Sequence, residues 1–375
     1  MSENGNISKA YKGIDIYNEG KEFKSKEEER INYIPGKMMK FFKKISDSIY
    51  FSSDNKGHLY YIEFNKDTEK FKITNLEYIC NDSKYILVDL IKSDKYDFYF
   101  SLDLNPCLNI FKIKENNNKK QVDIIQHKNL RKNQNRNKYN KLYETNLPNN
   151  DCLILFGENI IEIWTYNIKN KNVNYEFIQI IKIDDNINNE NNINDDEINN
   201  NIITSIYKID NENYYLFNPI KFQIIQFKIS EIKSDNKENE IIPLMEIKNK
   251  INIKAIDEQI EKISCLFFDK NYVFLGLFDS LVVSSITYGE ILQKYKIGQV
   301  NQIKLTKDKK HIYVFVKQDE KKYFFIKYKF IDNEGLNEEK KIPYDSWIYK
   351  FDIIEEKNLI VIYNVKGLIS LLNFE

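Results

Sequence analysis

The sequence LIVIYNVKGLISLLNFE, residues 359–375, contains two apolar runs separated by a short polar turn around Lys366 and Gly367. Both runs are rich in Ile, Leu and Val and are too short for a helix, so the pattern predicts an antiparallel pair of β-strands. No further strand pattern follows the second run. An unpaired strand exposes a row of backbone donors and acceptors, so we expect another segment of the chain to cover it.

The same paired pattern recurs along the whole chain. The six other pairs lie at 48–64, 97–113, 152–166, 214–228, 272–286 and 312–329. A short apolar strand pattern precedes many of these pairs, as at 85–91, 202–209, 262–268, 300–305 and 347–354. A more polar strand pattern follows many of them, as at 71–76, 121–126, 176–183, 241–247 and 291–297. The chain therefore reads as a repeated unit of four antiparallel strands.

Such a repeat predicts an all-β fold. The second strands of the units begin near residues 49, 97, 152, 214, 272, 312 and 359, so the spacing varies between 40 and 62 residues. Repeats of 40 to 50 residues with four strands each are typical of β-propeller blades, once insertions are allowed. Two stacked or tandem β-sandwiches could use the same strands, and that alternative remains open at this point.

The arrangement resembles the WD40-like class of seven-bladed β-propellers over essentially the whole chain. IEIWTYN, residues 161–167, is similar to the Trp-Asp end of a third strand. Thr165 stands where the family has Asp, and the Gly-His dipeptide is absent from the position that the family gives it. The resemblance therefore concerns architecture and implies a protein-docking scaffold, without the family's hydrogen-bond network. Trp164 and Trp347 are interpreted as core residues.

The seventh unit has three strand patterns instead of four. GIDIY, residues 13–17, is a short isolated strand pattern near the other end of the sequence. Propellers often close when one terminus completes the blade that the other begins. We expect residues 11–18 to pair with residues 368–374. The predicted single domain, residues 1–375, has blades at about 32–78, 80–128, 140–184, 201–249, 260–298, 300–344, and 346–375 plus 11–18.

Three segments are predicted to be inserted loops, at 119–141, 184–201 and 230–258. Residues 184–201 carry six acidic and no basic side chains, with too little apolar surface to order, so we expect a mobile loop. Within the third segment and beyond it, INIKAIDEQIEKI (251–263) places isoleucines near one helical face, which predicts a short helix on the rim.

The segment 119–141 is strongly basic. Its Lys and Arg residues are Lys119, Lys120, Lys128, Arg131, Lys132, Arg136, Lys138 and Lys141, against a single Asp. Such an arm could contact RNA or an acidic partner, with Tyr139 and Tyr143 available for stacking on bases. The alternative is a solvated loop that is rich in Lys and Asn because of codon bias, and we favour that alternative.

The sequence offers little for catalysis. There are only three histidines, His58, His127 and His311, and none has metal-ligand spacing with other candidate ligands. The four cysteines, Cys80, Cys107, Cys152 and Cys265, are far apart and fit buried free thiols in a reducing compartment. We expect no enzymatic activity, no metal and no cofactor.

The charges balance, with 56 Lys and Arg against 56 Asp and Glu, which argues against a polyanion binder that uses its whole surface. The sequence has no apolar run long enough for a membrane span and no signal-peptide pattern, so we expect a cytoplasmic or nuclear protein without membrane contact. The first functional hypothesis is a scaffold that binds other proteins and no small-molecule substrate. The alternative is a non-catalytic propeller subunit of an RNA-processing or RNA-modifying complex that contacts RNA through the basic segment.

Overall fold

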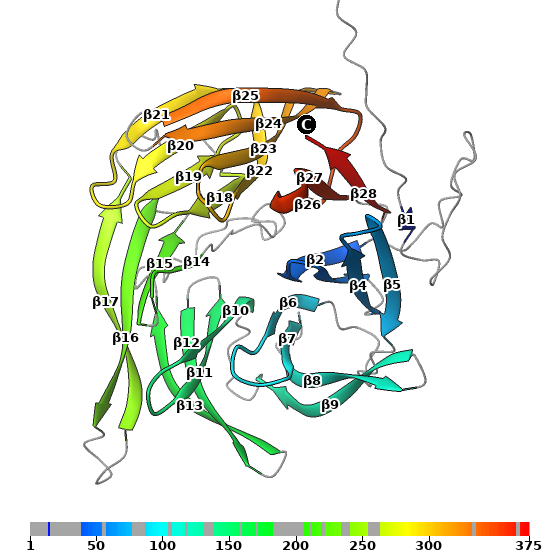
Figure 1. The fold of residues 1–375 in the computed structure, drawn as a ribbon. Helices are drawn as coiled ribbons and strands as arrows, with labels where there is room; N and C mark the ends of the chain where they lie inside the picture. The colour runs from blue at the N-terminus through cyan, green and yellow to red at the C-terminus, as the bar shows by residue number, and fades with distance from the viewer. Residues whose placement is uncertain are drawn as a thin grey trace, which may run out of the picture.

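The computed structural model shows a ring of seven four-stranded antiparallel sheets (Figure 1). The residues that it describes are 14–15, 39–54, 58–76, 87–103, 107–116, 119–130, 139–157, 160–169, 172–182, 206–210, 212–218, 222–233, 241–253, 263–320, 322–331, 335–364 and 368–374. The alternative of two β-sandwiches is therefore excluded, and the predicted all-β, seven-bladed propeller is confirmed.

The first four blades follow one another along the chain. Blade 1 contains β2 (Met39–Ser46), β3 (Ile49–Asp54), β4 (Leu59–Asn65) and β5 (Lys70–Leu76). Blade 2 contains β6 (Leu87–Lys92), β7 (Tyr99–Asp103), β8 (Cys107–Asn116) and β9 (Lys119–Asn129). Blade 3 contains β10 (Tyr139–Asn146), β11 (Asp151–Gly157), β12 (Ile160–Lys169) and β13 (Asn172–Lys182). Blade 4 contains β14 (Ile206–Lys208), β15 (Asn213–Asn218), β16 (Gln223–Lys233) and β17 (Ile241–Asn252).

The last three blades complete the ring. Blade 5 contains β18 (Cys265–Phe268), β19 (Tyr272–Gly276), β20 (Ser280–Ser285) and β21 (Ile291–Lys296). Blade 6 contains β22 (Gln299–Leu305), β23 (His311–Asp319), β24 (Lys322–Ile331) and β25 (Gly335–Tyr344). Blade 7 contains β26 (Lys350–Ile354), the 3-10 turn η1 (Glu355–Lys357), β27 (Leu359–Tyr363) and β28 (Leu368–Asn373), and then β1 (Ile14–Asp15).

Each seam between neighbouring blades has its own apolar core. Seven clusters of buried side chains correspond to the seven seams, from blades 1 and 2 round to blades 7 and 1. At the last seam Tyr50 and Phe42 of blade 1 pack with Tyr363 of blade 7, and the ring centroids of Phe42 and Tyr363 are 4.4 Å apart. Packing between the first and last blades therefore closes the ring.

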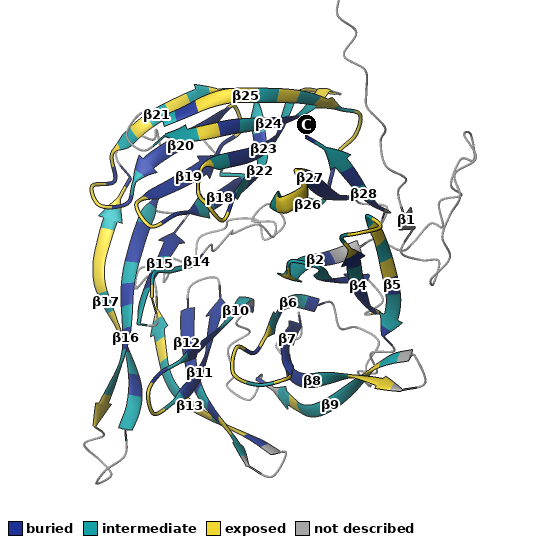
Figure 2. Ribbon diagram, in the orientation of Figure 1, coloured by how far each residue is buried: buried dark blue, intermediate teal, exposed yellow. Residues whose placement is uncertain are grey.

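Burial decreases from the middle of each blade to the rim (Figure 2). The strands β7, β11 and β19 are buried at every residue, because another blade covers each face of the sheet. The outer strand β21 instead alternates between intermediate and exposed residues. This gradient explains why the inner pairs have continuous apolar sequences and the fourth strands have mixed ones.

Side chains cover the outer edges of some sheets. The amide of Gln179 in β13 accepts a 2.9 Å hydrogen bond from Met245 N in β17 and donates one of 3.3 Å to Met245 O. In the same way, Tyr295 in β21 accepts a 2.8 Å hydrogen bond from Leu336 N in β25. These contacts satisfy backbone groups at sheet edges that would otherwise be open to another chain.

The isolated strand near the start of the sequence does complete blade 7. β1 pairs antiparallel with β28, with Ile14 opposite Ile369 and Asp15 opposite Leu368. The predicted partnership is therefore confirmed at residues 14–15, and the rest of the expected segment 11–18 lies outside the described residues. The partner segment that the last sheet requires comes from more than 350 residues away in the chain.

The register of β1 gives a direct prediction. Directly opposed residues of an antiparallel pair have Cα atoms about 4.5–5.5 Å apart, which suits a disulfide. We expect the double variant Asp15→Cys/Leu368→Cys to form an intramolecular disulfide, visible as faster migration on a non-reducing gel. In the control Asp15→Cys/Ser370→Cys, the second cysteine is displaced by two residues, or about 7 Å along the strand. Equal cross-linking in both variants would contradict the observed register.

Part of the predicted loop insertions is wrong. Residues 119–129 form β9, and residues 230–233 and 241–252 belong to the long β16–β17 hairpin. The strand patterns at 121–126 and 241–247 were recognised, but the loop ranges also covered them, because the residues near the rim are mostly intermediate or exposed and their polar side chains resemble a loop. The predicted mobile loop 184–201 lies outside the described residues, as does most of the predicted helix 251–263, of which 251–252 form the end of β17.

The two tryptophans differ. Trp164 is buried, as expected, whereas Trp347 is 40% exposed and only its ring edges contact Phe315 and Tyr323. Trp347 precedes β26 in the connection between blades, where no sheet covers it, so its interpretation as a core residue is corrected. Among the described residues, no helix has the length and apolarity to cross a membrane.

Candidate functional site

The structure separates the residues of the predicted basic arm. Lys119, Lys120 and Lys128 lie in β9, Lys141 lies in β10, and Arg131, Lys132, Arg136 and Lys138 lie outside the described residues. β9 is the outer strand of blade 2, and β10 is the innermost strand of blade 3 (Figure 1). The described members of the set therefore do not form one surface.

Two of these lysines make contacts between blades. Lys120 Nζ lies 2.6 Å from the carboxylate of Glu63 in blade 1 and 4.2 Å from the ring centroid of Tyr61. Lys128 Nζ lies 4.4 Å from the ring centroid of Trp164 in blade 3, and burial lowers the pKa of this ammonium. These charges are already engaged by side chains of the neighbouring blades.

The two tyrosines that the RNA hypothesis for the basic segment made available for stacking are engaged too. Tyr139 is buried in the seam between blades 2 and 3, and the hydroxyl of Tyr143 donates a 2.9 Å hydrogen bond to Ile206 O in blade 4. Neither ring is available for a base to stack on, so the interpretation of these tyrosines as stacking residues is wrong.

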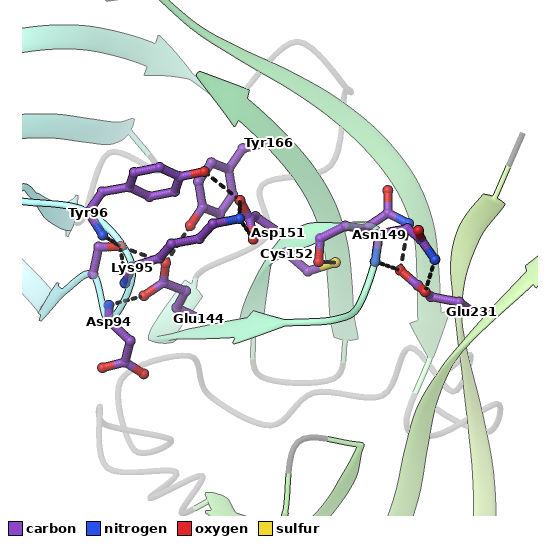
Figure 3. Close-up of polar contacts among 11 residues, drawn as sticks. Asp94, Lys95, Tyr96, Glu144, Asn149, Asp151, Cys152, Tyr166 and Glu231 are labelled. Atoms are coloured by element: carbon purple, nitrogen blue, oxygen red, sulfur yellow. Dashed lines mark hydrogen bonds and ion pairs between the residues drawn. The ribbon is translucent and has the colours of Figure 1, made fainter. Parts of the chain in front are cut away.

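One end of the ring carries a series of polar contacts between loops (Figure 3). The buried carboxylate of Glu144 accepts hydrogen bonds of 2.7 Å from Ser93 Oγ and Asp94 N in blade 2, and it also accepts one from the hydroxyl of Tyr166. Burial and that hydrogen bond raise the pKa of Tyr166. Glu144 thus connects the loop between β6 and β7 of blade 2 to blade 3.

The same series continues on both sides of Glu144. Lys95 Nζ lies 2.8 Å from the carboxylate of Asp151, which also accepts a 2.7 Å hydrogen bond from Tyr96. Glu231 of blade 4 accepts hydrogen bonds of 2.9 Å from Asn149 N and from the side-chain amide of Asn150 (Figure 3). Blades 2, 3 and 4 are therefore joined by side-chain contacts at this end.

A second polar network lies among the innermost strands. The fully buried Asp89 in β6 accepts a hydrogen bond of 2.6 Å from Lys43 Nζ in β2 and one of 3.0 Å from Leu142 N in β10. A β-bulge between Leu87 and Asp89 shifts the register just before this carboxylate. One side chain therefore connects blades 1, 2 and 3.

Blades 6 and 7 contribute further lysines to this network. Lys350 Nζ donates a 3.2 Å hydrogen bond to Phe42 O in blade 1, and Lys304 Nζ lies 3.6 Å from the carboxylate of Asp352. We call Lys43, Lys141, Lys304 and Lys350 the central basic cluster. Burial, with the positive charges of Lys141, Lys304 and Lys43, lowers the pKa of Lys350 to about 7, because Asp89 offsets only part of these effects.

Sequence reasoning missed three of these four lysines. Only Lys141 was singled out, as part of the basic segment, whereas Lys43, Lys304 and Lys350 occur in segments that were interpreted as structural strands. The sequence did contain a signal for these lysines. Lysine recurs in the first strand of several units, and a propeller places that strand innermost. The strand KFDII (350–354), for example, begins with one.

The three histidines each have a local partner. His58 Nδ1 lies 2.8 Å from the carboxylate of Asp54, His127 Nδ1 hydrogen-bonds to Asn109, and His311 Nε2 lies 3.5 Å from Glu339. Among the described residues, no group of three or more His, Cys, Asp or Glu side chains could hold a metal ion. These histidines hold turns and neighbouring strands.

The described cysteines Cys107, Cys152 and Cys265 are buried free thiols, as expected. Burial raises the pKa of Cys152 to about 12 and also raises that of Cys265. Because the thiolate is the reactive form, these two side chains are poor nucleophiles.

No family profile and no curated protein matches this sequence. Solved structures do share its fold. The structure of U3-55K is 7% identical, with a TM-score of 0.53, and the alignment covers 92% of this chain and 97% of that one. The C-terminal WD40 domain of Sif2 is 11% identical, with a TM-score of 0.52 and coverage of 88% and 93%. The fold is a seven-bladed, WD40-like β-propeller.

The fold alone does not decide the activity of a propeller. A Bacteroides uniformis protein that carries a provisional 6-phosphogluconolactonase name is 12% identical, with a TM-score of 0.52 and coverage of 85% and 93%. At such identities the likeness concerns architecture only. The function of this WD40-like propeller must therefore be argued from its own surface.

Large exposed apolar side chains are unevenly distributed on this propeller. Among the described residues there are seven, namely Phe177, Ile180, Ile232, Phe278, Tyr288, Leu292 and Trp347. Six of the seven belong to blades 3, 4 and 5, and Phe278 in the β19–β20 turn is 67% exposed. Phe177, Ile180 and Leu292 lie on outer strands, at the rim. We call the exposed apolar side chains of blades 3, 4 and 5 the apolar rim.

Proposed function

We propose that this protein is a non-enzymatic scaffold, a subunit of a multiprotein complex, that binds another protein through the apolar rim. The observation that supports this proposal is the concentration of exposed apolar side chains in three consecutive blades. Exposed apolar groups that gather in one region mark interaction sites more often than isolated ones do.

The construction of the ring supports this role. Seven apolar seams and the polar contacts between loops hold the blades in place, which favours a preformed surface with little ordering cost on binding. The described histidines and the thiols of Cys152 and Cys265 are engaged or deactivated by burial, which favours a binding role over catalysis.

The RNA-associated alternative has less support. Lys120 and Lys128 contact neighbouring blades, and Lys141 lies on an inner strand away from them. Of the other basic residues of the segment, Lys119 lies in β9, and Arg131, Lys132, Arg136 and Lys138 lie outside the described residues. We therefore favour a protein partner.

The test is co-purification of tagged protein from its native cells, with quantitative mass spectrometry of the bound polypeptides. The triple variant Ile180→Ser/Phe278→Ser/Leu292→Ser removes three rim side chains. We expect the recovery of the main partner to fall by about tenfold or more, because a few apolar anchors carry most of the binding energy of an interface. The control Trp347→Ser changes an exposed apolar residue outside blades 3–5 and should retain the partner. Full recovery by the triple variant would overturn the proposal.

A further inference from the structure

The central basic cluster has more positive charge than its carboxylates balance. Its four lysines come from blades 1, 3, 6 and 7, and the acidic side chains in contact with them are Asp89 and Asp352. Asp352 is also shared with Lys44, whose Nζ lies 3.9 Å away. If both carboxylates are assigned to the cluster, two of its four ammonium groups have no acidic partner among the residues that the structure describes.

Such a surplus is unfavourable at this position. Partly buried charges of like sign repel each other more strongly than charges in open solvent do. At Lys350, burial first and then the charges of Lys141, Lys304 and Lys43 lower the pKa to about 7. In the unliganded protein the cluster therefore lowers its own charge by releasing a proton near neutral pH.

After the contacts already made by the cluster, its ammonium groups still have N–H donors for a ligand. Lys43 donates to Asp89, and Lys350 donates to Phe42 O, but each ammonium has three donors. The side chains of Lys43 and Lys304 are 30% and 38% exposed, so solvent reaches the cluster. The inner strands β2, β10, β22 and β26, which carry these four lysines, surround the centre of the ring (Figure 1).

We propose that the central basic cluster, formed by Lys43, Lys141, Lys304 and Lys350, binds a small, multiply charged anion of the polyphosphate class. Lysine binds phosphate as a compact point charge, and several lysines on separate strands suit an anion that carries several phosphate groups. A single carboxylate would not neutralise the surplus charge. The ligand is bound and not converted, and its site is separate from the apolar rim.

The first test is calorimetric titration of the whole protein with inorganic tripolyphosphate, with sodium sulfate at equal ionic strength as the reference. We expect one anion per chain, with an affinity that weakens as salt is added. Lys350→Gln and Lys304→Gln should each weaken binding by about tenfold. The control Lys322→Gln removes a lysine that is 70% exposed in the β23–β24 hairpin of blade 6, and it should leave the affinity unchanged.

A second readout is the proton balance of binding. At pH 8, Lys350 is mostly neutral in the free protein, and a bound anion should raise its pKa, so that this lysine takes up close to one proton on binding. Titrations in buffers of different ionisation enthalpy measure the net proton balance of the wild type and of Lys350→Gln, and the protons of tripolyphosphate itself contribute to both. We expect the two balances to differ by close to one proton at pH 8 and by much less at pH 5.5.

The contrary outcomes are distinct. If the wild-type protein fails to bind tripolyphosphate at about 1 mM, the lysines are structural contacts only and the proposal is wrong. An equal loss in Lys322→Gln would mean non-specific attraction, and an equal proton balance in the wild type and Lys350→Gln at pH 8 would exclude Lys350. Binding of a single-stranded RNA oligonucleotide without binding of tripolyphosphate would also overturn the proposal. None of these results depends on the apolar rim.

Discussion

Replacing Asp89 with Ala is expected to lower the free energy of unfolding by about 3–5 kcal/mol, because removal of one partner of a buried ion pair leaves an uncompensated charge. Asp89 is fully buried, pairs with Lys43, and accepts hydrogen bonds from the backbone N–H groups of Leu90 and Leu142. The variant therefore loses an ion pair and two hydrogen bonds, and blades 1, 2 and 3 lose their shared contact. Urea unfolding monitored by circular dichroism measures the change.

Asp352→Ala provides the matched control. This carboxylate also lies on an inner strand near lysines, but its side chain is partly exposed and its ion pairs with Lys304 and Lys44 are 3.6 and 3.9 Å long. Exposed pairs of this kind contribute about 0–1 kcal/mol. If both substitutions destabilise the protein equally, the burial of Asp89 is not the cause of the effect.

The contribution of Asp89 should depend on pH in a definite direction. Burial alone would raise the pKa of this carboxyl, but the charges of Lys43 and Lys141 and the hydrogen bonds from Lys43 and Leu142 outweigh it, and the pKa lies below its ordinary value. Since the folded-state pKa is below the unfolded value of about 3.9, the stabilisation is complete above that pH and is lost as pH falls through the folded-state pKa. The difference in stability between the wild type and Asp89→Ala should therefore shrink in acid and be constant from pH 5 to 6.

The repeat of strand pairs could be predicted from the sequence because it depends on local patterns. Both faces of an inner blade strand are buried, so segments such as YVFLG (272–276) are apolar throughout and easy to find. The outer strand β9 was recognised only at 121–126 and was also included in a loop insertion, because the run KKQVDIIQHKN is polar at both ends and its described side chains are intermediate or exposed. The pairing of β1 with β28 could be predicted as well, because it followed from counting strands and needed no knowledge of side chains.

The polar networks could not be predicted in the same way. Asp89 and Lys43 are 46 residues apart, and their contact depends on which strand is innermost and on the bulge that shifts the register at Asp89. The four lysines of the central basic cluster meet only because the ring closes and brings blade 7 beside blade 1. Counting strands predicts that closure, but it does not show which side chains of the inner strands lie close together, so neither the cluster nor its surplus charge is apparent before the ring is built.

Replacing Glu144 with Ala is expected to lower the free energy of unfolding by about 3 kcal/mol, because it leaves buried donors without their acceptor. The donors are the hydroxyls of Ser93 and Tyr166 and the backbone N–H of Asp94, and they come from both blade 2 and blade 3. Water can reach the Asp94 N–H more easily than the Tyr166 hydroxyl, which is buried, so the loss should concentrate at Tyr166.

A double-mutant cycle with Tyr166→Phe tests this explanation. Tyr166→Phe removes one donor and keeps the ring, so by itself it should cost about 1 kcal/mol. In Glu144→Ala/Tyr166→Phe the unsatisfied hydroxyl is gone, so the double variant should be more stable than the sum of the single effects predicts, by about 0.5–3 kcal/mol. Strict additivity would show that the two side chains do not interact in solution. If Glu144→Ala alone leaves the free energy of unfolding unchanged, other contacts hold the junction between blades 2 and 3, such as the ion pair of Lys95 with Asp151.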